Sequence, residues 1–241
     1  LGHAWDRFEL LVDSKHEEKG KISRSPENAA KSRKSEENRM KKNNRAVELT
    51  KQIVRMNTIN PPGGETACAQ ILGRILEEEG FTVIYHELAP NRANLIARIG
   101  GNEKKLPLCF TGHLDTVPLG VANWRKSAFD GETDQGRLFG RGTSDMKSGI
   151  AAFVAAISGL GKKLDRSAGL ELVFTAGEET GCQGAFGLVA KPGLLGKVGA
   201  VLVGEPTSNY PMLGHKGAYW INAKTHGVTA HGSMPEKGVN A

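Results

Sequence analysis

The sequence has few cysteines, and they are not arranged for metal binding or cross-linking. Cys68, Cys109 and Cys182 are odd in number and far apart. Without a CxxC pair, neither a thiolate zinc site nor a disulfide framework is indicated. A chain without disulfides is typical of a reducing compartment, so we expect a cytoplasmic protein.

Long apolar runs are also missing. No stretch approaches the roughly 20 consecutive apolar residues that a transmembrane helix needs. The first residues do not show the basic segment followed by an apolar one that is typical of a secretory signal. We therefore expect a globular protein that has no membrane partner.

Outside the N-terminal segment, the chain has almost no excess of positive charge. The net charge of the 241 residues is +6, and +4 of it falls in residues 1–45. The remaining residues hold 20 Lys or Arg against 18 Asp or Glu. A nucleic-acid-binding domain usually carries a basic patch or stripe, so we expect no nucleic-acid partner.

The N-terminal segment 1–39 does not read as a domain. It is rich in Ser, Lys, Glu and Asn, and the first methionine of the chain is Met40. Low hydrophobicity with many charges is the composition of disordered segments. We expect either a disordered tail or untranslated upstream sequence, with the patterned sequence starting at residue 40.

From residue 40 onward, helical and strand patterns alternate, which is typical of an α/β fold with a mostly parallel sheet flanked by helices. Apolar residues at helical spacing predict helices over 46–56, 68–79 and 150–160. Short apolar runs predict strands at 81–85, 94–99, 106–110, 170–176 and 200–203. Residues 218–225 alternate between apolar and polar side chains, which predicts an antiparallel strand with one exposed face.

Acidic residues and one histidine follow the predicted strands or precede a helix. They are His113 and Asp115, Asp145, Glu178 and Glu179, and Glu205. The carboxyl ends of parallel strands meet at one edge of the sheet, where α/β proteins place their sites. A histidine with several carboxylates is a ligand set for a divalent metal such as zinc.

Each of these groups has a simpler explanation when it is taken alone. His113 and Asp115 could be a hydrogen-bonded pair, and Asp145 could only cap a helix. Glu178 and Glu179 could lie in an exposed turn. The glycine-rich stretch 136–149 lacks the order of a phosphate-binding loop.

Five motifs, in order along the chain, carry a specific resemblance. They are GHLDTVP at 112–118, GRGTSDMKSG at 140–149, AGEETG at 176–181, GEPT at 204–207 and AHGSMP at 230–235. This set resembles the M20 family of metallohydrolases, whose catalytic domain has a zinc-exopeptidase-like fold. The stretches 60–63 (NPPG) and 215–217 (HKG) resemble the branch of acetylornithine deacetylase and succinyl-diaminopimelate desuccinylase.

The resemblance implies a role for each candidate residue. It makes His113, Asp145, Glu179 and Glu205 ligands of two divalent metal ions, zinc or cobalt, with Asp145 between them and often followed by a cis peptide bond. It makes Glu178 the general base, Asp115 the residue that orients His113, and His231 the residue that stabilises the oxyanion.

The implied reaction is hydrolysis of the amide bond of an N-acyl amino acid by metal-activated water. A metallo-exopeptidase that cleaves dipeptides or C-terminal residues is the alternative within the family. An inactive pseudoenzyme or truncated binding module is the alternative outside catalysis, although a Glu at position 178 beside Glu179 has no evident structural purpose.

The resemblance also implies a domain organisation. Residues 40–216 correspond to the metal-binding catalytic domain, in incomplete form, and residues 217–241 to the beginning of an inserted α+β lid that also forms the homodimer. A further metal-binding histidine is then expected beyond residue 241. We therefore expect the isolated chain to be inactive and the full-length parent to be an enzyme.

Overall fold

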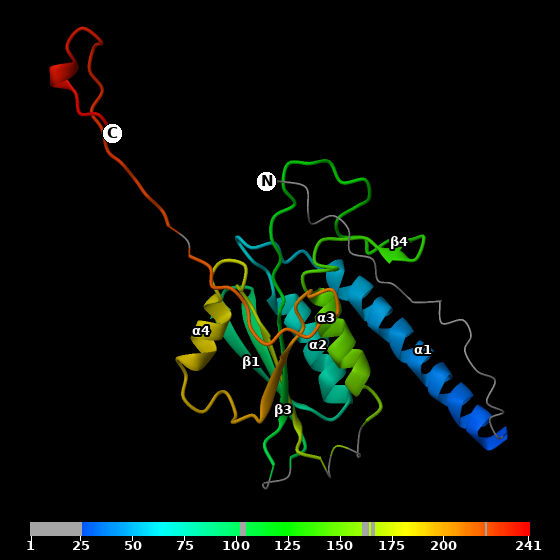
Figure 1. Cartoon of the computed structure of the whole chain (residues 1–241). Helices are drawn as coiled ribbons and strands as arrows, with labels where there is room; N and C mark the ends of the chain where they lie inside the picture. Colours follow the sequence, from blue (N-terminus) through cyan, green and yellow to red (C-terminus); the bar gives the residue numbers. More distant parts are fainter. Residues whose placement is uncertain (1–25, 102–104, 161–163, 165–166, 220) are drawn as a thin grey trace. The chain divides into compact units, whose positions relative to one another are not determined.

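The computed structural model describes residues 26–101, 105–160, 164, 167–219 and 221–241 (Figure 1). The chain divides into two compact units, Leu1–Ser208 and Asn209–Ala241, and each is described by itself. Among the described residues, no helix combines the length and the apolar character that crossing a bilayer requires.

The first unit is built on a five-stranded mixed sheet with the strand order β1-β2-β6-β3-β7. The strands are β1 (Thr82–Ala89), β2 (Arg92–Ile99), β3 (Leu108–His113), β6 (Leu170–Thr175) and β7 (Ala200–Val203). β3 pairs in parallel with both β6 and β7, whereas β1 and β2 form an antiparallel hairpin that joins β6 at one edge. The expected α/β fold is thus confirmed, and the hairpin makes the sheet mixed.

Helices cover both faces of this sheet (Figure 1). α1 (Pro26–Val54), α2 (Thr66–Glu78) and α3 (Lys147–Ile157) enclose the larger core, and α4 (Gln183–Val189) packs on the opposite face. Leu72 of α2, Val154 of α3 and Phe174 of β6 are fully buried in the larger core. The spacing of the apolar residues of α2 produces this packing, because residues three or four apart lie on one side of a helix.

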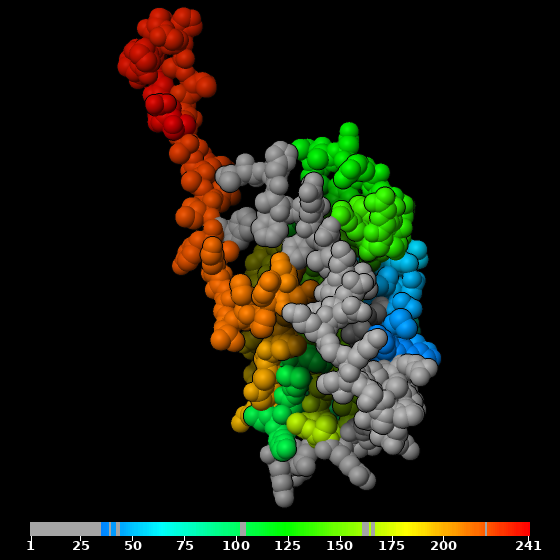
Figure 2. Space-filling view, turned by 45° about the vertical axis from the view of Figure 1, so that its right-hand side comes forward, coloured from blue at the N-terminus to red at the C-terminus, as the bar shows by residue number. Residues whose placement is uncertain are grey.

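Much of the segment between β3 and α3 lies at the surface of the first unit, where it is coloured green in Figure 2. It contains the short hairpin formed by β4 (Thr133–Asp134) and β5 (Arg137–Leu138). The guanidinium of Arg141 lies 5.1 Å from the ring centroid of Trp124 and donates to the backbone carbonyl of Pro118 at 3.0 Å. Trp124 thus packs against another residue of the same loop.

Helix α1 begins at Pro26, so residues 26–39 are helical in this structure, and the expectation of a disordered tail or untranslated sequence over 1–39 stays a prediction. Proline is favoured in the first turn of a helix, and this segment is rich in Ala, Lys, Arg and Glu, which are strong helix formers. Met40 is still 56% exposed, and burial begins only near Leu49. Residues 1–25 lie outside the described residues, and a coding start at residue 40 stays a prediction.

A buried lysine connects α3 to the end of α1. The Lys147 side chain is 1% exposed, and its ammonium donates to the backbone carbonyls of Ile53 and Met56, each at 2.9 Å. Burial lowers the pKa of Lys147 from its usual value. The Ile53 carbonyl also accepts from the backbone N–H of Met56 at 3.3 Å, and Met56 follows the end of α1, so Lys147 adds a donor where the helix ends.

We expect Lys147→Met to lower the free energy of unfolding by about 2–5 kcal/mol, because the Met56 carbonyl loses its ammonium donor and the Ile53 carbonyl keeps only the N–H of Met56 at 3.3 Å. Lys51→Met is the matched control: its ammonium pairs with Glu48, whose side chain is 70% exposed. An exposed pair of this kind contributes less than about 1 kcal/mol. Urea unfolding of both variants tests the difference, and an equal loss would contradict it.

The second unit contains little regular structure. Val228 and Val239 form an isolated bridge, and Pro235–Lys237 form a 3₁₀ turn. The strand expected over 218–225 is not formed by the described residues of that range, which leave out only 220. No neighbouring strand in the described part of this unit pairs with the range, and an unpaired strand is not stable in water. A lid domain starting at residue 217 stays a prediction.

Candidate metal centre

Three strands deliver polar groups to one edge of the sheet because they run in parallel. β3 ends at His113, β6 is followed by Glu178 and Glu179, and Glu205 follows β7 after a single glycine. The strand pattern of the sequence alone indicated this convergence. The site is therefore built on the sheet rather than on the flexible ends of loops.

Asp145 reaches the same edge from the loop before α3. Gly149, in the first turn of α3, lies so close to Gly204 that a Cβ atom would overlap the carbonyl oxygen of Gly204. Because residue 149 is glycine, α3 can approach the loop that carries Glu205. The peptide bond between Asp145 and Met146 is cis, as the resemblance implied.

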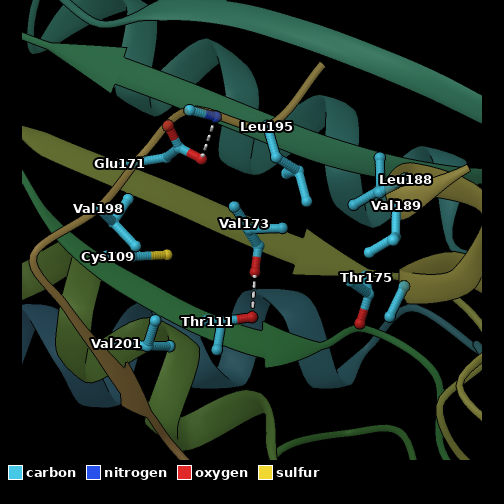
Figure 3. Close-up of a pocket in the computed structure, with 12 residues that line it drawn as sticks. Cys109, Thr111, Glu171, Val173, Thr175, Leu188, Val189, Leu195, Val198 and Val201 are labelled. Atoms are coloured by element: carbon cyan, nitrogen blue, oxygen red, sulfur yellow. Dashed lines mark hydrogen bonds between the residues drawn. The ribbon is translucent and has the colours of Figure 1, made fainter. Parts of the chain in front are cut away.

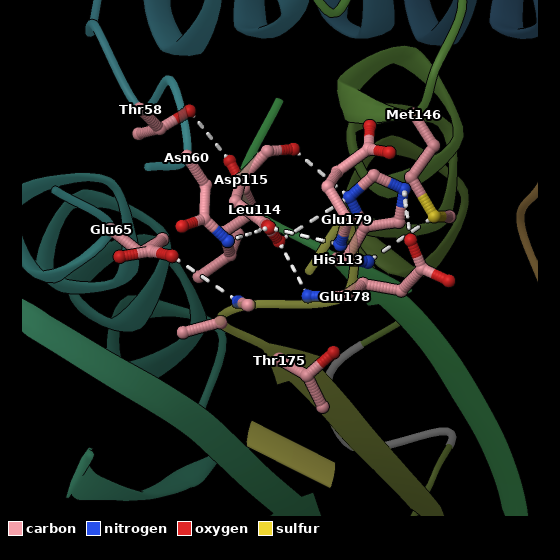
Figure 4. A network of polar contacts seen from close by, with 12 residues as sticks. Thr58, Asn60, Glu65, His113, Leu114, Asp115, Met146, Thr175, Glu178 and Glu179 are labelled. Atoms are coloured by element: carbon pink, nitrogen blue, oxygen red, sulfur yellow. Dashed lines mark hydrogen bonds and ion pairs between the residues drawn. The ribbon is translucent and has the colours of Figure 1, made fainter. Parts of the chain in front are cut away.

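His113 is the centre of the cluster and is 2% exposed (Figure 4). Its Nδ1 lies 2.9 Å from the backbone carbonyl oxygen of Asp115, which only accepts, so Nδ1 carries a proton. Its Nε2 lies 3.0 Å from Asp145 Oδ1 and 3.5 Å from Glu205 Oε1. The ring therefore directs one nitrogen at the backbone and the other at carboxylates.

The pKa of His113 reflects these surroundings. Burial alone would lower it, but hydrogen bonds to Asp115 and Asp145 and the charge of Glu205 raise it to about 11. Nε2 thus lies where a positive charge is strongly favoured. A proton on Nε2 and a metal ion are alternative cations for the same group of carboxylates.

Asp115 is fully buried and holds the neighbouring turn as well as the histidine. Its carboxylate accepts hydrogen bonds from Asn60 Nδ2 at 2.8 Å and from the backbone N–H groups of Glu178 at 3.0 Å and Glu179 at 3.1 Å. Burial would raise the pKa of Asp115, but the hydrogen bonds with His113 and Asn60 lower it on balance. The carboxylate Oδ1 is 3.6 Å from His113 Nδ1, so the backbone carbonyl is the closer contact to the ring.

We expect Asp115→Asn to lower the free energy of unfolding by about 2–4 kcal/mol, because an amide NH₂ then faces a buried donor. Thr180→Val is the control, since Asn60 Nδ2 also donates to Thr180 Oγ1 at 2.8 Å but keeps its bond to Asp115 in that variant. Chemical denaturation should show a loss of less than about 1.5 kcal/mol for the control. Equal losses would mean that Asp115 does not hold the turn.

Glu179 completes a group whose atoms are close enough to share a metal ion. One ligand atom from each of His113, Asp145 and Glu179 lies within 4.8 Å of the other two. Glu179 Oε1 is buried and has no hydrogen-bond partner among the described residues. Burial, together with the charges of Asp145 and other acidic neighbours, raises the pKa of Glu179 to about 7.

Glu205 and Glu178 lie at the margin of this group. Burial and the charges of Asp145 and Glu178 raise the pKa of Glu205 to about 7, although the charge of His113 opposes the shift. Glu178 Oε2 is 3.9 Å from His113 Nε2, and the Glu178 side chain is 40% exposed. Cys182 donates its thiol to Glu178 Oε1 at 3.8 Å. Glu178 thus combines access to solvent with proximity to the cluster.

The residues present fit a divalent metal ion. An imidazole nitrogen and carboxylate oxygens are the donors that zinc and cobalt accept. The buried Oε1 of Glu179, for which the described residues offer no hydrogen-bond donor, is an acceptor that a cation would satisfy. The backbone carbonyl bound to His113 Nδ1 fixes the ring so that Nε2 faces the carboxylates, as outer partners of histidine ligands do.

His231, the remaining predicted site residue, lies in the second unit. There its ring Nδ1 is 2.9 Å from Ser233 Oγ, and the side chain is exposed. The structure therefore brings His113, Asp115, Asp145, Glu178, Glu179 and Glu205 together. The assigned role of each residue, and the role of His231, stay predictions.

Sequence reasoning gave no role to several buried polar residues around the site. Thr58 Oγ1 donates to the carbonyl of Leu114 at 2.7 Å, and Asn60 binds Asp115. Glu65 is fully buried and accepts from the N–H of Gly177 at 3.2 Å. For Asn60 the sequence contained a hint, because this residue lies in the NPPG stretch that contributed to the resemblance.

A pocket lies on the face of the sheet that α4 covers, away from the larger core (Figure 3). It encloses about 230 Å³ and is lined mainly by apolar side chains, including Val173, Leu188 and Val198. Its one acidic residue, Glu171, already pairs with Arg98 at 2.7 Å. This chemistry does not match a metal site, so the cluster at the strand ends is the stronger candidate.

Comparison with known proteins gives related sequences over most of the chain. The chain is 36% identical over 197 residues to a probable succinyl-diaminopimelate desuccinylase of Staphylococcus epidermidis, covering 81% of this chain and 47% of that protein. It is 33% identical over 205 residues to acetylornithine deacetylase of Proteus mirabilis, covering 81% and 51%. The chain thus spans about half the length of the curated relatives it matches.

Solved structures agree on the fold. An M20 family metallo-carboxypeptidase from Sulfolobus solfataricus superposes with a TM-score of 0.56 at 22% identity, covering 66% of this chain and 37% of that one. The family profile described as peptidase family M20/M25/M40 matches residues 109–217, the segment that contains His113, Asp145 and Glu205. On the motifs, the fold and these relatives, the chain belongs to peptidase family M20/M25/M40.

Proposed function

We propose that the protein containing this chain is a metal-dependent amidohydrolase that removes the acyl group from an N-acyl amino acid. One observation carries the proposal: His113, Asp145 and Glu179 present ligand atoms within 4.8 Å of one another, and Glu178 lies in the same turn as Glu179. The cluster thus supplies both donors for a metal and an acid to transfer protons.

The number of acidic groups supports two divalent ions rather than one. Asp145, Glu178, Glu179 and Glu205 surround a single histidine, with Asp115 behind it. Carboxylates this close repel each other unless cations or protons compensate. In the proposed arrangement His113 and Glu205 would hold one ion, Glu179 would hold the other, and Asp145 would serve both. Zinc is the first candidate because of the imidazole ligand, and cobalt is the second.

When bound, the metal ions supply Lewis-acid polarisation of the amide carbonyl and lower the pKa of water at the site. Glu178 takes a proton from the water whose oxygen attacks the amide carbon. The carbon–nitrogen bond then breaks, and Glu178 returns the proton to the leaving nitrogen. The products are a carboxylate and a free amine. We assign to His231 the stabilisation of the oxyanion, and to residues 217–241 the start of a lid through which two subunits pair.

The names of the relatives suggest the substrate class. Those at 33–36% identity are named for succinyl-diaminopimelate and acetylornithine. Both names describe an acyl group on the nitrogen of a diamino acid. We therefore place the substrate among N-succinyl or N-acetyl derivatives of diamino acids. We place the reaction in the cytoplasm, as the sequence analysis expects.

The test is an assay of the whole protein loaded with Zn²⁺ or Co²⁺. Release of free amine from N-succinyl-diaminopimelate or N-acetylornithine, at least tenfold faster than from dipeptides, is the expected result. Faster cleavage of dipeptides or C-terminal residues would replace the proposal with an exopeptidase. Metal binding without turnover of either class would indicate an inactive binding protein.

A further inference from the structure

Four consecutive backbone amides in the turn 176–179 are each held by a buried side chain. The N–H of Ala176 donates to Asn94 Oδ1 at 2.8 Å, and that of Gly177 to Glu65 Oε1 at 3.2 Å. The next two amides donate to the carboxylate of Asp115. Loops usually satisfy such groups with water or local backbone. Here acceptors from three separate segments hold the turn that carries Glu178 and Glu179.

The acceptor for Gly177 belongs to a buried ion pair. Glu65 is fully buried, and the guanidinium of Arg92 contacts both of its oxygens, at 2.9 Å from Nη2 to Oε1 and 3.1 Å from Nε to Oε2. The N–H of Gly64 also donates to Oε2 at 2.9 Å. With a further contact of 3.3 Å from Arg92 Nε, Oε1 accepts three hydrogen bonds and Oε2 accepts two, so the orientation of the carboxylate is fixed.

The guanidinium of Arg92 fits against the backbone of the turn. A Cβ on Gly177 would lie 2.8 Å from Arg92 Nη2. Gly177 also has a positive φ of 70°, so both the close contact and the backbone conformation favour glycine. Arg92 Nη1 also donates to Gln183 Oε1 at 3.0 Å. The turn is thus held at Gly177 by Glu65 of the Glu65–Arg92 pair and at Glu178 by Asp115 (Figure 4 shows Glu65 and Asp115).

We propose that Glu65 and Arg92 are positioning residues for the metal centre: through the N–H of Gly177 they set the place of Glu178 and Glu179. The inference rests on the proposed function, in which Glu179 binds metal and Glu178 transfers the proton. Neither Glu65 nor Arg92 contacts the predicted ligands with its side chain. They act through the backbone of the turn.

A purely structural role is the alternative, and the chain contains a matched control for it. Glu171 on β6 is 3% exposed, binds Arg98 of β2 at 2.7 Å, and accepts from the N–H of Gly196 at 3.4 Å. Both pairs therefore join a buried glutamate, an arginine of β2 and a glycine amide. Arg98 is near the end of β2 and Arg92 is at its start, so only the Glu65–Arg92 pair is next to the turn 176–179.

The test compares Glu65→Gln with Glu171→Gln in the 241-residue chain. In each variant the new amide NH₂ faces an N–H donor, so both should be less stable than the wild type. Only Glu65→Gln should raise the Kd for Co²⁺, by about 10–100-fold, as changes to outer partners of metal ligands do. Only Glu65→Gln should also change the visible absorption spectrum of the bound Co²⁺.

Equal effects of the two variants on Co²⁺ binding, or no effect of Glu65→Gln, would overturn the positioning role while the proposed function stands. Failure of the wild-type chain to bind Co²⁺ would overturn the proposed metal centre, and the inference with it. If Glu65→Gln does not fold, Arg92→Lys replaces it with Arg98→Lys as control, because lysine cannot make the two-pronged contact.

Hydrogen exchange gives a readout that needs no metal. Exchange of the amides of residues 177–179 should be at least tenfold faster in Glu65→Gln than in Glu171→Gln, compared under conditions of equal global stability. Unchanged exchange at these amides would show that the ion pair does not hold the turn, and would overturn the inference.

Discussion

Replacing Glu178 by glutamine is expected to lower the turnover number of the whole protein by about 10²–10⁴-fold, the usual contribution of a positioned acid or base. Glutamine keeps the size of the side chain but cannot take a proton. The affinity for Zn²⁺ should change by less than about threefold. The backbone N–H of Glu178, and not its side chain, binds Asp115, so the turn stays in place.

Steady-state rates and isothermal titration with Zn²⁺ together measure this prediction. Glu87→Gln is the control, because Glu87 is an exposed residue of β1 outside the cluster. A Glu178→Gln variant with wild-type turnover would remove Glu178 from the mechanism. Loss of Zn²⁺ binding in that variant would instead make Glu178 a ligand.

Replacing the neighbouring residue, Glu179, by glutamine should have the opposite pattern. We expect the Kd for Zn²⁺ to rise by more than about 100-fold, beyond the effect of changing an outer partner. Stability without added metal should not fall. Glu179 is half-buried among acidic neighbours, and its buried Oε1 has no hydrogen-bond partner in the described part of the chain. A neutral side chain removes an uncompensated charge from that place.

Thermal unfolding of the Glu179→Gln variant with EDTA and with Zn²⁺ separates the two effects. With EDTA, the variant should unfold at or above the wild-type temperature. With Zn²⁺, the wild type should gain stability and the variant should gain little, because only binding to the folded state stabilises it. A variant that is destabilised with EDTA and still binds Zn²⁺ tightly would show that Glu179 is a structural residue.

The part of the site that could be predicted from sequence depends on strands and their ends. Apolar runs located β3, β6 and β7, and the polar residues that follow them had to meet once these strands were parallel. The motif resemblance then selected Asp145, which precedes a helix rather than following a strand. Local pattern and family motif were sufficient for these positions.

The residues that hold the site could not be predicted in the same way. Glu65 and Gly177 are 112 positions apart in sequence, and nothing local indicates that one accepts from the other. Lys147 reads as an ordinary polar residue at the start of a helix, but it is buried against the end of α1. A buried polar residue is recognisable only from its partners, and those are set by tertiary structure.

The differences over the terminal segments have a related cause. The first half of α1 is helical because its residues favour helix, although the described side chains from Ser35 to Arg45 are not buried. The alternation over 218–225 correctly describes residues suited to a strand, but a strand needs a neighbour to bond with. Composition did not indicate the helix in the first case, and alternation indicated a strand without a partner in the second.

The most direct test of the metal centre is X-ray diffraction from crystals of the protein grown with Zn²⁺, measured on both sides of the zinc absorption edge. The account predicts anomalous density in contact with His113 Nε2 and with carboxylate oxygens of Asp145, Glu179 and Glu205. Density that is absent from this edge of the sheet, or present only on other histidines such as His86 or His215, would contradict it.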